Sequence, residues 1–268
     1  MTNQFDRPVM TKISHIVPAD SMVERALSVV RILGAGVVTL IASIGTVVFA
    51  GAERTRGGIA PLLRLWAKSA LFLSKVNVKI EGLHHVNPSD SYIFMTNHQS
   101  MYDILVVQAS LPVKSVWFAK VELFRIPVFG RALLRADYIP VDRSSKKTAF
   151  QSLEQAINKL KMGFSIVIFP EGSRSSDGNV KPFKRGGVVL AMRSGRPIVP
   201  VSILGSGAIL PKGRLQLRPG TVFVKIHQPI ETACIEKKNI DLLIHKVQSI
   251  IASDVEAYNK SLESIYHE

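Results

Sequence analysis

The uncharged stretch ILGAGVVTLIASIGTVVFAGA, residues 32–52, is the sequence feature that most constrains how this chain can fold. As a helix it is about long enough to cross the roughly 30 Å hydrocarbon core of a bilayer. A buried core helix is the alternative, because Gly and Ala are frequent in the stretch and no Trp or Tyr flanks it. A cleaved secretory signal is disfavoured, since the apolar run starts late and has no clean cleavage region. We therefore expect a retained, membrane-associated helix.

Cationic residues follow this stretch, and we place the downstream domain on the cytoplasmic side by the positive-inside tendency. They are Arg54, Arg56, Arg64 and Lys68. Residues 57–74 carry apolar positions at helical spacing, which suits a helix lying at the membrane interface or an amphipathic helix packed on the domain. The two segments could cross the membrane or form a helical hairpin within one leaflet.

From residue 76 the pattern changes to short β-rich runs separated by helical stretches. The runs are 76–81, 92–96, 115–119, 137–141, 165–169, 198–203 and 221–226, and helical patterns cover 146–161, 183–193 and 239–258. This alternation predicts an α/β fold, with a mixed, largely buried β-sheet flanked by helices. We expect an N-terminal membrane-anchoring region at residues 1–75 and an α/β domain at residues 76–268.

The charge balance and the cysteine content limit the partners that we expect. The chain has 34 Lys and Arg against 20 Asp and Glu, a formal net charge of +14, which favours polyanionic partners or an anionic lipid surface. A basic protein that binds nucleic acid would interleave aromatics with its basic clusters, but here the cations are dispersed and aromatics make up 7%, so we expect no nucleic acid partner. The single cysteine, Cys234, cannot form an internal disulfide, and no Cys/His cluster has zinc spacing, so we expect no metal.

The run TNHQSMYD, residues 96–103, places a histidine just past a predicted strand, where α/β folds tend to carry functional groups. Asp103 follows His98 by five residues and can accept a hydrogen bond from one imidazole nitrogen. The other nitrogen can then take a proton from a substrate hydroxyl, which is the base-and-orienter half of a catalytic triad. The alternative is that Asp103 only caps the following helix.

A second run, FPEGSRS at residues 169–175, comes directly after a predicted strand. Gly172 permits a tight turn and Arg174 presents a planar head with five donors, so the loop suits a phosphate or a carboxylate. The alternative is a β-turn in which Glu171 pairs with Arg174. A basic rim follows the loop, formed by Lys181, Lys184 and Arg185.

Together the two runs resemble the glycerolphosphate acyltransferase family, in which the bacterial lysophosphatidic acid acyltransferases are the nearest members. Further blocks agree in order and spacing: Lys120 to Leu123 with Pro127 and Gly130, Tyr138 to Arg143, and Val199 to Val201. The resemblance spans roughly residues 76 to 226. It implies the α/β fold of that family and a membrane-bound enzyme of phospholipid biosynthesis.

The resemblance also implies a mechanism. His98 deprotonates the acceptor hydroxyl, Asp103 orients the imidazole, and the resulting alkoxide attacks the thioester of acyl-CoA or of an acyl carrier protein. No cofactor and no covalent acyl-enzyme is needed, so Cys234 is expected to have a structural role. Transfer to lysophosphatidic acid would give phosphatidic acid. Other lysophospholipids or lyso-aminolipids are alternative acceptors.

The same resemblance implies the substrate-binding residues. Arg174, with Lys120 and Arg143, is expected to contact the acceptor phosphate. Glu171 and Gly172 shape the loop, and Ser173 keeps a hydroxyl where many family members carry Thr. The implied location is a bacterial inner membrane, with the catalytic domain on the cytoplasmic side.

Two rival interpretations remain from other classes. A non-enzymatic basic protein bound to membrane or nucleic acid would rely on the net charge alone. A lipid or phosphate ester hydrolase could use the same His and Asp, but the chain has no G-x-S-x-G nucleophile elbow and no metal-ligand cluster. Three other histidines, His84 and His85 before the first motif and His227 after a predicted strand, have no acidic partner at a telling spacing, and we assign them no catalytic role.

Overall fold

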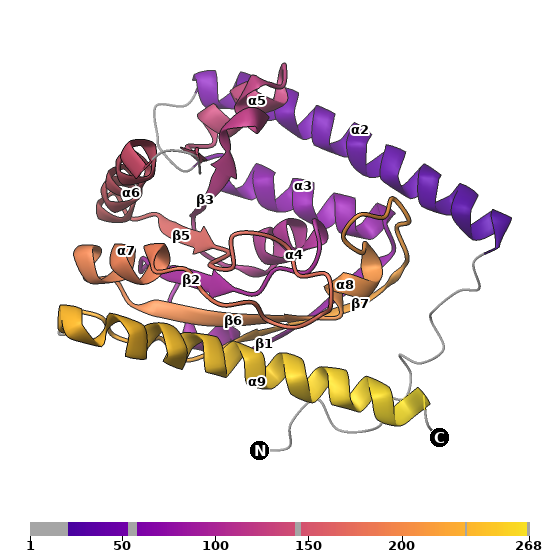
Figure 1. Ribbon diagram of the computed structural model, residues 1–268. Coiled ribbons are helices and arrows are strands. Elements are labelled where there is room, and N and C mark those ends of the chain that lie inside the picture. Colours follow the sequence, from indigo (N-terminus) through magenta and orange to yellow (C-terminus); the bar gives the residue numbers. More distant parts are fainter. Residues whose placement is uncertain (1–20, 53–57, 143–145, 234, 267–268) are drawn as a thin grey trace.

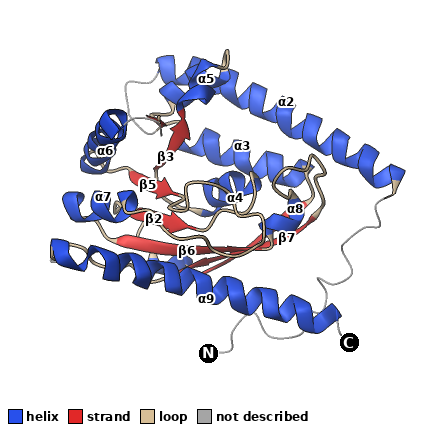
Figure 2. Cartoon of the chain, viewed as in Figure 1, coloured by secondary structure: helices blue, strands red, loops and turns tan. Residues whose placement is uncertain are grey.

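Seven strands form one mixed sheet in the order β1-β7-β6-β2-β5-β3-β4 (Figure 1, Figure 2). Their bounds are Val76–Glu81 (β1), Ile93–Thr96 (β2), Ser115–Lys120 (β3), Ile139–Val141 (β4), Ser165–Ile168 (β5), Ile198–Leu204 (β6) and Gly220–Ile226 (β7). Neighbouring strands are parallel except β6 and β7, which are antiparallel. The strands β2, β5 and β6 therefore end at the same edge of the sheet.

The computed structural model describes residues 21–52, 58–142, 146–233 and 235–266. Four residues named in the sequence analysis lie outside these ranges: Arg54, Arg56, Arg143 and Cys234. Each of the seven predicted β-rich runs contains a strand, which confirms the predicted α/β class. The run at 137–141 forms a strand only from Ile139, because Asp137 adopts a positive φ of 64° just after the helix Phe129–Arg135 (α5).

Helices cover both faces of the sheet. Their bounds are Met22–Ala52 (α2), Ala60–Leu73 (α3), Tyr102–Ser110 (α4), Phe129–Arg135 (α5), Lys146–Lys161 (α6), Gly186–Ser194 (α7), Ser206–Ile209 (α8) and Ile240–Tyr266 (α9), with short 3₁₀ turns at Leu83–His85 (η1), Val121–Arg125 (η2) and Lys237–Asn239 (η3). Side chains alternate along β2, so Phe94 enters the core under α3 and α4, whereas Ile93 and Met95 enter the core under α6, α7 and α9. The predicted helix at 239–258 continues to Tyr266 because Leu262 still packs on this second core.

Helix α2 is longer than the uncharged stretch that predicted it and begins at Met22. The extra turns bring in Arg31, whose side chain is only 7% exposed and pairs with Glu24 at 3.3 Å. Within the apolar part, Thr39, Ser43 and Thr46 donate their hydroxyl protons to carbonyls one turn earlier, at 2.7 to 2.8 Å. These bonds satisfy the hydroxyls inside an apolar environment.

The helix α2 is long and apolar enough to cross a membrane, by length and composition. Only 11% of its apolar window is buried inside the protein, which argues against the alternative of a core helix. The exposed large apolar side chains of α2 include Leu33, Val37, Leu40, Ile41, Ile44, Val48 and Phe49. Water would be an unfavourable surrounding for a continuous surface of this kind.

The same helix also contacts the α/β domain, as Figure 1 shows for its course beside α3 and α5. The Trp66 indole N–H on α3 donates to the Thr39 hydroxyl at 3.0 Å. Near the start of α2, the Ser28 hydroxyl accepts from the Leu217 N–H at 2.7 Å. On α3, Arg64 is not a free interfacial cation, since its guanidinium donates to the Leu111 carbonyl at the end of α4.

Phe94 and Phe150 lie in different environments: Phe94 is 0% exposed in the core under α3 and α4, whereas Phe150 is 57% exposed on the surface of α6. We expect Phe94→Ala to lower the free energy of unfolding by about 3–5 kcal/mol, because it leaves a cavity between β2 and α4. The control Phe150→Ala loses only an exposed contact with the Arg193 guanidinium and should cost about 1 kcal/mol or less. Denaturant unfolding of both variants in detergent measures the difference. Equal losses would contradict this description of the core.

Candidate active site

The residues of both sequence motifs meet where β2 and β5 end. His98 lies just past β2, and the loop from Phe169 begins just past β5, which pairs with β2 in parallel. Asn97 fixes the start of the first loop, because its side-chain amide exchanges two hydrogen bonds of 2.8 Å with the backbone of Ile203 in β6. The loop is therefore fastened to the centre of the sheet.

His98 and Asp103 are in direct contact. The His98 Nδ1 and Asp103 Oδ2 atoms lie 2.8 Å apart, and the Asp103 side chain is completely buried in the first turn of α4. The same carboxylate oxygen accepts from the backbone N–H groups of Gln99 and Ser100, at 2.8 and 2.9 Å. With Asp103 ionised, Nδ1 carries the proton and Nε2 is left as the basic nitrogen.

An aromatic ring fixes the plane of the His98 imidazole. Phe169 stacks on it with ring centroids 3.9 Å apart and planes inclined by 15°, and Trp117 lies behind Phe169 at 5.7 Å. The Trp117 indole donates to the buried Gln108 side chain at 2.9 Å. Hydrogen bonding to Asp103 and stacking on Phe169 thus restrain the ring in two directions. Phe169 belongs to the second sequence motif, but its sequence position did not indicate this role.

Glu171 joins the two loops through its buried carboxylate. One oxygen accepts from the His98 backbone N–H at 2.8 Å, and the other accepts from the Lys181 backbone N–H at 3.2 Å. Burial raises the pKa of Glu171 from 4.5 to about 7, although the two N–H groups and the Lys181 charge partly oppose the rise. The alternative of a Glu171–Arg174 pair is not what the structure shows.

Of the other predicted substrate-binding residues, Gly172, Ser173 and Arg174 lie farther along this loop, whereas Lys120 does not. Gly172 has a φ of +76°, as its tight turn requires, and the exposed Ser173 hydroxyl accepts from the Lys181 ammonium at 3.3 Å. Arg174 is half-buried. Lys120 is exposed at the end of β3, on the far side of β5 from β2. Arg143 lies outside the described residues.

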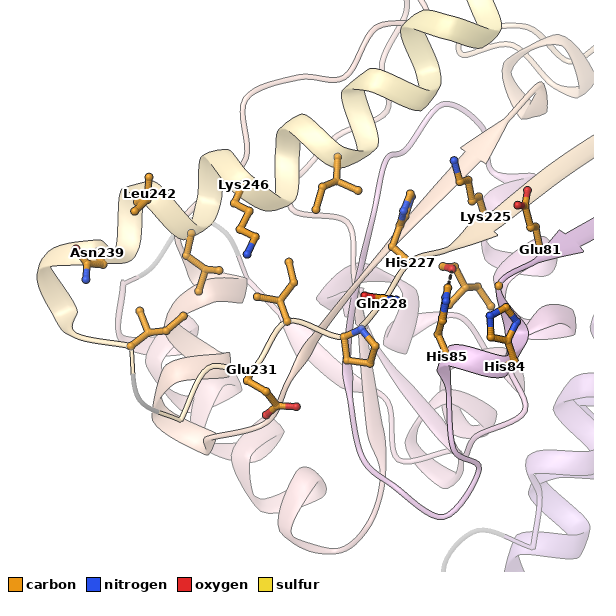
Figure 3. A pocket seen from close by; sticks show the side chains of 17 residues that line it. Glu81, His84, His85, Lys225, His227, Gln228, Glu231, Asn239, Leu242 and Lys246 are labelled. Carbon is orange, nitrogen blue, oxygen red and sulfur yellow. Dashed lines mark hydrogen bonds between the residues drawn. The ribbon is translucent and has the colours of Figure 1, made fainter. Parts of the chain in front are cut away.

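A hollow of about 850 Å³ lies away from both motifs (Figure 3). Its lining includes His84, His85 and His227, to which no catalytic role was assigned. His227 nevertheless has an acidic partner that its sequence spacing did not reveal, since its Nε2 lies 2.8 Å from the Asp254 carboxylate on α9. Burial favours a raised pKa for Asp254, but hydrogen bonds from His227, Lys225 and Ser202 lower it to about 2.

The arrangement supports proton transfer at one imidazole nitrogen beside a basic loop. It offers a partly buried, oriented imidazole held in a fixed plane, and cationic side chains on and just after the second loop. Among the described residues, no group of three or more His, Cys, Asp or Glu side chains could hold a metal ion. The chemistry that these residues can perform by themselves is the activation of a hydroxyl next to an anionic group.

Comparisons with known proteins point to one enzyme family. The family model described as Acyltransferase matches residues 77–204. The 1-acyl-sn-glycerol-3-phosphate acyltransferase of Limnanthes alba is 33% identical over 195 residues, which cover 72% of this chain and 69% of that protein. The alpha form of the same enzyme from Homo sapiens is 31% identical over 188 residues, or 70% of this chain and 66% of that protein.

A solved structure extends the similarity to the whole fold. The crystal structure of the 1-acyl-sn-glycerophosphate (LPA) acyltransferase PlsC from Thermotoga maritima matches with a TM-score of 0.75 and 28% sequence identity. The match covers 87% of this chain and 94% of that one. This coverage is wider than that of the family model, which ends at Leu204.

The buried position of Glu171 has a consequence for stability. Its folded pKa of about 7 is above the unfolded value of 4.5, so the native protein keeps this proton when the unfolded chain has lost it. The stabilisation is complete below pH 4.5 and is lost as pH rises through 7. We expect the Glu171→Gln variant to lack this pH-dependent fall in the free energy of unfolding, whereas the exposed control Glu122→Gln should keep it. Urea unfolding at pH 5 and pH 8 measures it, and an unchanged pH dependence in Glu171→Gln would contradict the assignment.

Proposed function

This chain belongs to the family of 1-acyl-sn-glycerol-3-phosphate acyltransferases, and from this premise we propose that its substrate is lysophosphatidic acid and its product phosphatidic acid. The acyl donor is acyl-CoA or an acyl carrier protein. The observation that carries the proposal is the 2.8 Å contact between His98 Nδ1 and the buried Asp103 carboxylate. We assign the catalytic domain to residues 76–268.

The proposed reaction runs through His98 Nε2. This nitrogen takes the proton of the acceptor hydroxyl while the hydroxyl oxygen attacks the thioester carbonyl carbon of the donor. The new C–O ester bond forms, the C–S bond breaks, and the leaving thiolate takes the proton back from the imidazolium. Asp103 stabilises the imidazolium charge and stays ionised throughout. No group on the protein is acylated, so the nucleophile is the substrate itself.

The charges around the second loop suit the phosphate of the acceptor. A phosphomonoester carries about two negative charges at neutral pH and offers three strong acceptor oxygens. We assign Arg174 to this phosphate, with Lys120 and Arg143 as further proposed contacts. Glu171 and Gly172 act by shaping the loop, since the carboxylate of Glu171 is already occupied by two backbone N–H groups.

The proposed position at the membrane follows from the contacts of α2. The helix touches the segment before β7 near its start and α5 farther along (Figure 1), so the α/β domain accompanies it over much of its length. A perpendicular crossing would carry polar parts of the domain into the hydrocarbon region, which is unfavourable. We therefore propose that α2 and α3 lie in one leaflet, with the domain on the cytoplasmic side. The relatives include chloroplast proteins as well, so the proposal concerns a membrane surface and not a particular organelle or organism.

The catalytic assignment predicts the behaviour of two variants. We expect His98→Ala to lower kcat by about 10³-fold or more and Asp103→Asn by at least roughly 10²-fold, because the base is lost or its tautomer is disturbed. The assay counts phosphatidic acid made from lysophosphatidic acid by the detergent-purified enzyme, with either donor. The exposed histidine variant His84→Ala is the control and should keep its rate within about twofold.

Two outcomes of this assay would change the proposal. Full activity of a folded His98→Ala variant would refute the assignment of the base. Product formed only from another lyso-lipid, with glycerol-3-phosphate and lysophosphatidylcholine tested in parallel, would keep the mechanism and replace the acceptor.

The single-leaflet position predicts from which face of the membrane the residues just before α2 and just before α3 can be labelled. In a Cys234→Ser background, we expect Ser21→Cys and Gly58→Cys both to react with a membrane-impermeant maleimide from the cytoplasmic face of sealed vesicles. Neither should react from the opposite face. A cysteine at Ser74, buried at the end of α3, serves as the unreactive control. Labelling of Ser21→Cys from the opposite face alone would show a full crossing.

A further inference from the structure

Two lysines from distant parts of the chain donate to one carbonyl oxygen. The Lys181 ammonium lies 2.7 Å from the Arg174 carbonyl oxygen, and the Lys212 ammonium lies 3.0 Å from the same atom. The two nitrogens are therefore at most the sum of these distances apart, about 5.7 Å. Two like charges held this close repel each other, and one carbonyl dipole compensates them only in part.

The two ammonium groups also keep donors to spare. An ammonium has three N–H donors. Within the described residues, Lys212 uses one of them on the Arg174 carbonyl, and Lys181 uses two, on that carbonyl and on the Ser173 hydroxyl. Neither lysine forms an ion pair with a carboxylate in the part of the chain that the structure describes. Three N–H donors remain, which equals the number of non-bridging oxygens of a phosphomonoester.

The backbone holds both lysines in place. Lys212 lies on a turn closed by the Arg214 N–H and the Pro211 carbonyl, with Gly213 at a φ of +82°. This turn is fastened to the His98 loop, because the Ser100 hydroxyl donates to the Leu210 carbonyl at 3.0 Å. Lys181 is fixed through its own N–H, which donates to Glu171. The side chains thus converge from two loops that the fold places independently.

The shared carbonyl lies next to the catalytic histidine. The Arg174 carbonyl and the Ser175 N–H belong to one peptide group, and that N–H donates to the His98 carbonyl at 2.7 Å. One side of this peptide therefore faces the backbone of His98, and the other side faces the two lysines. An anion bound by the lysines would therefore be separated from the His98 backbone by one peptide group.

We propose that Lys181 and Lys212 bind the phosphate of the lysophosphatidic acid acceptor. This assignment rests on the proposed function and adds to it two phosphate ligands outside the motif residues. The phosphates of the acyl donor share the same chemistry, so the experiment has an arm for each substrate. Lys212 lies in none of the motif blocks of the sequence, and it follows the end of the family-model match at Leu204.

The first measurement is steady-state kinetics of the full-length protein in detergent, with each substrate varied in turn. We expect Lys212→Met and Lys181→Met each to raise KM for lysophosphatidic acid about tenfold or more, with kcat within about twofold and KM for the donor unchanged. Lys212→Arg should restore most of the affinity. The control is Lys246→Met, an exposed lysine at the hollow of Figure 3, and it should match the wild type.

Other kinetic outcomes would overturn the proposal. A higher KM for acyl-CoA or acyl carrier protein with an unchanged acceptor KM would assign the lysines to the donor. A fall in kcat alone would show that they only support the loop.

A second measurement separates this proposal from the proposed function. Binding of lysophosphatidic acid and of neutral monoacylglycerol, in detergent micelles, is measured on His98→Ala protein with and without Lys212→Met. We expect the lysine change to weaken binding of the phosphate-bearing lipid by about tenfold and to leave the neutral lipid unaffected. If the wild type makes no phosphatidic acid, the proposed function fails, yet this binding difference still tests the lysines. Equal binding with and without Lys212 would refute their role.

Discussion

The two hydrogen bonds that Glu171 accepts from the backbones of His98 and Lys181 hold the candidate site together. They join a loop that follows β2 to a loop that follows β5, and parallel pairing of these strands brings the two loops to one edge of the sheet. The carboxylate is out of water, so its partners are difficult to exchange for solvent. Loss of either partner would leave a buried acceptor without compensation. One buried side chain, which neither transfers the proton nor binds the phosphate, therefore fixes the His98 loop and the basic loop relative to each other.

The sequence predicted the parts of the fold that depend on local pattern. The seven strands were found because buried strands are short, apolar and rich in β-branched residues, as VNVKIE and IVPVSI are. The His98–Asp103 contact could also be predicted from the sequence, because the two residues are close in the chain and α4 begins between them. The length of α2 was underestimated, because the charge of Arg31 marked the start of the apolar stretch, whereas in the structure Arg31 pairs with Glu24 within the helix.

Contacts between distant segments could not be read in the same way. Nothing in the sequence around Phe169 indicates that its ring will stack on His98, because that contact depends on the register of β2 and β5. His227 and Asp254 meet only when β7 has been placed against α9. Lys212 approaches Arg174 through a turn whose position depends on Gly213 and Ser100. In each case the fold determines which residue makes the contact, and the sequence shows only what kind of side chain is present.

The hydrogen bond between Ser28 and Leu217 links the membrane-associated helix α2 to the segment that precedes β7. The segment from Leu210 to Leu217 is attached to the His98 loop at one end and to α2 at the other, so the imidazole has a fixed height relative to that helix. If α2 lies at a constant level in a leaflet, the base meets only hydroxyls that lie at the matching level. Lipids with the same head group but a hydroxyl seated deeper or shallower would then be discriminated by their depth in the bilayer, with no contact that distinguishes their chemistry.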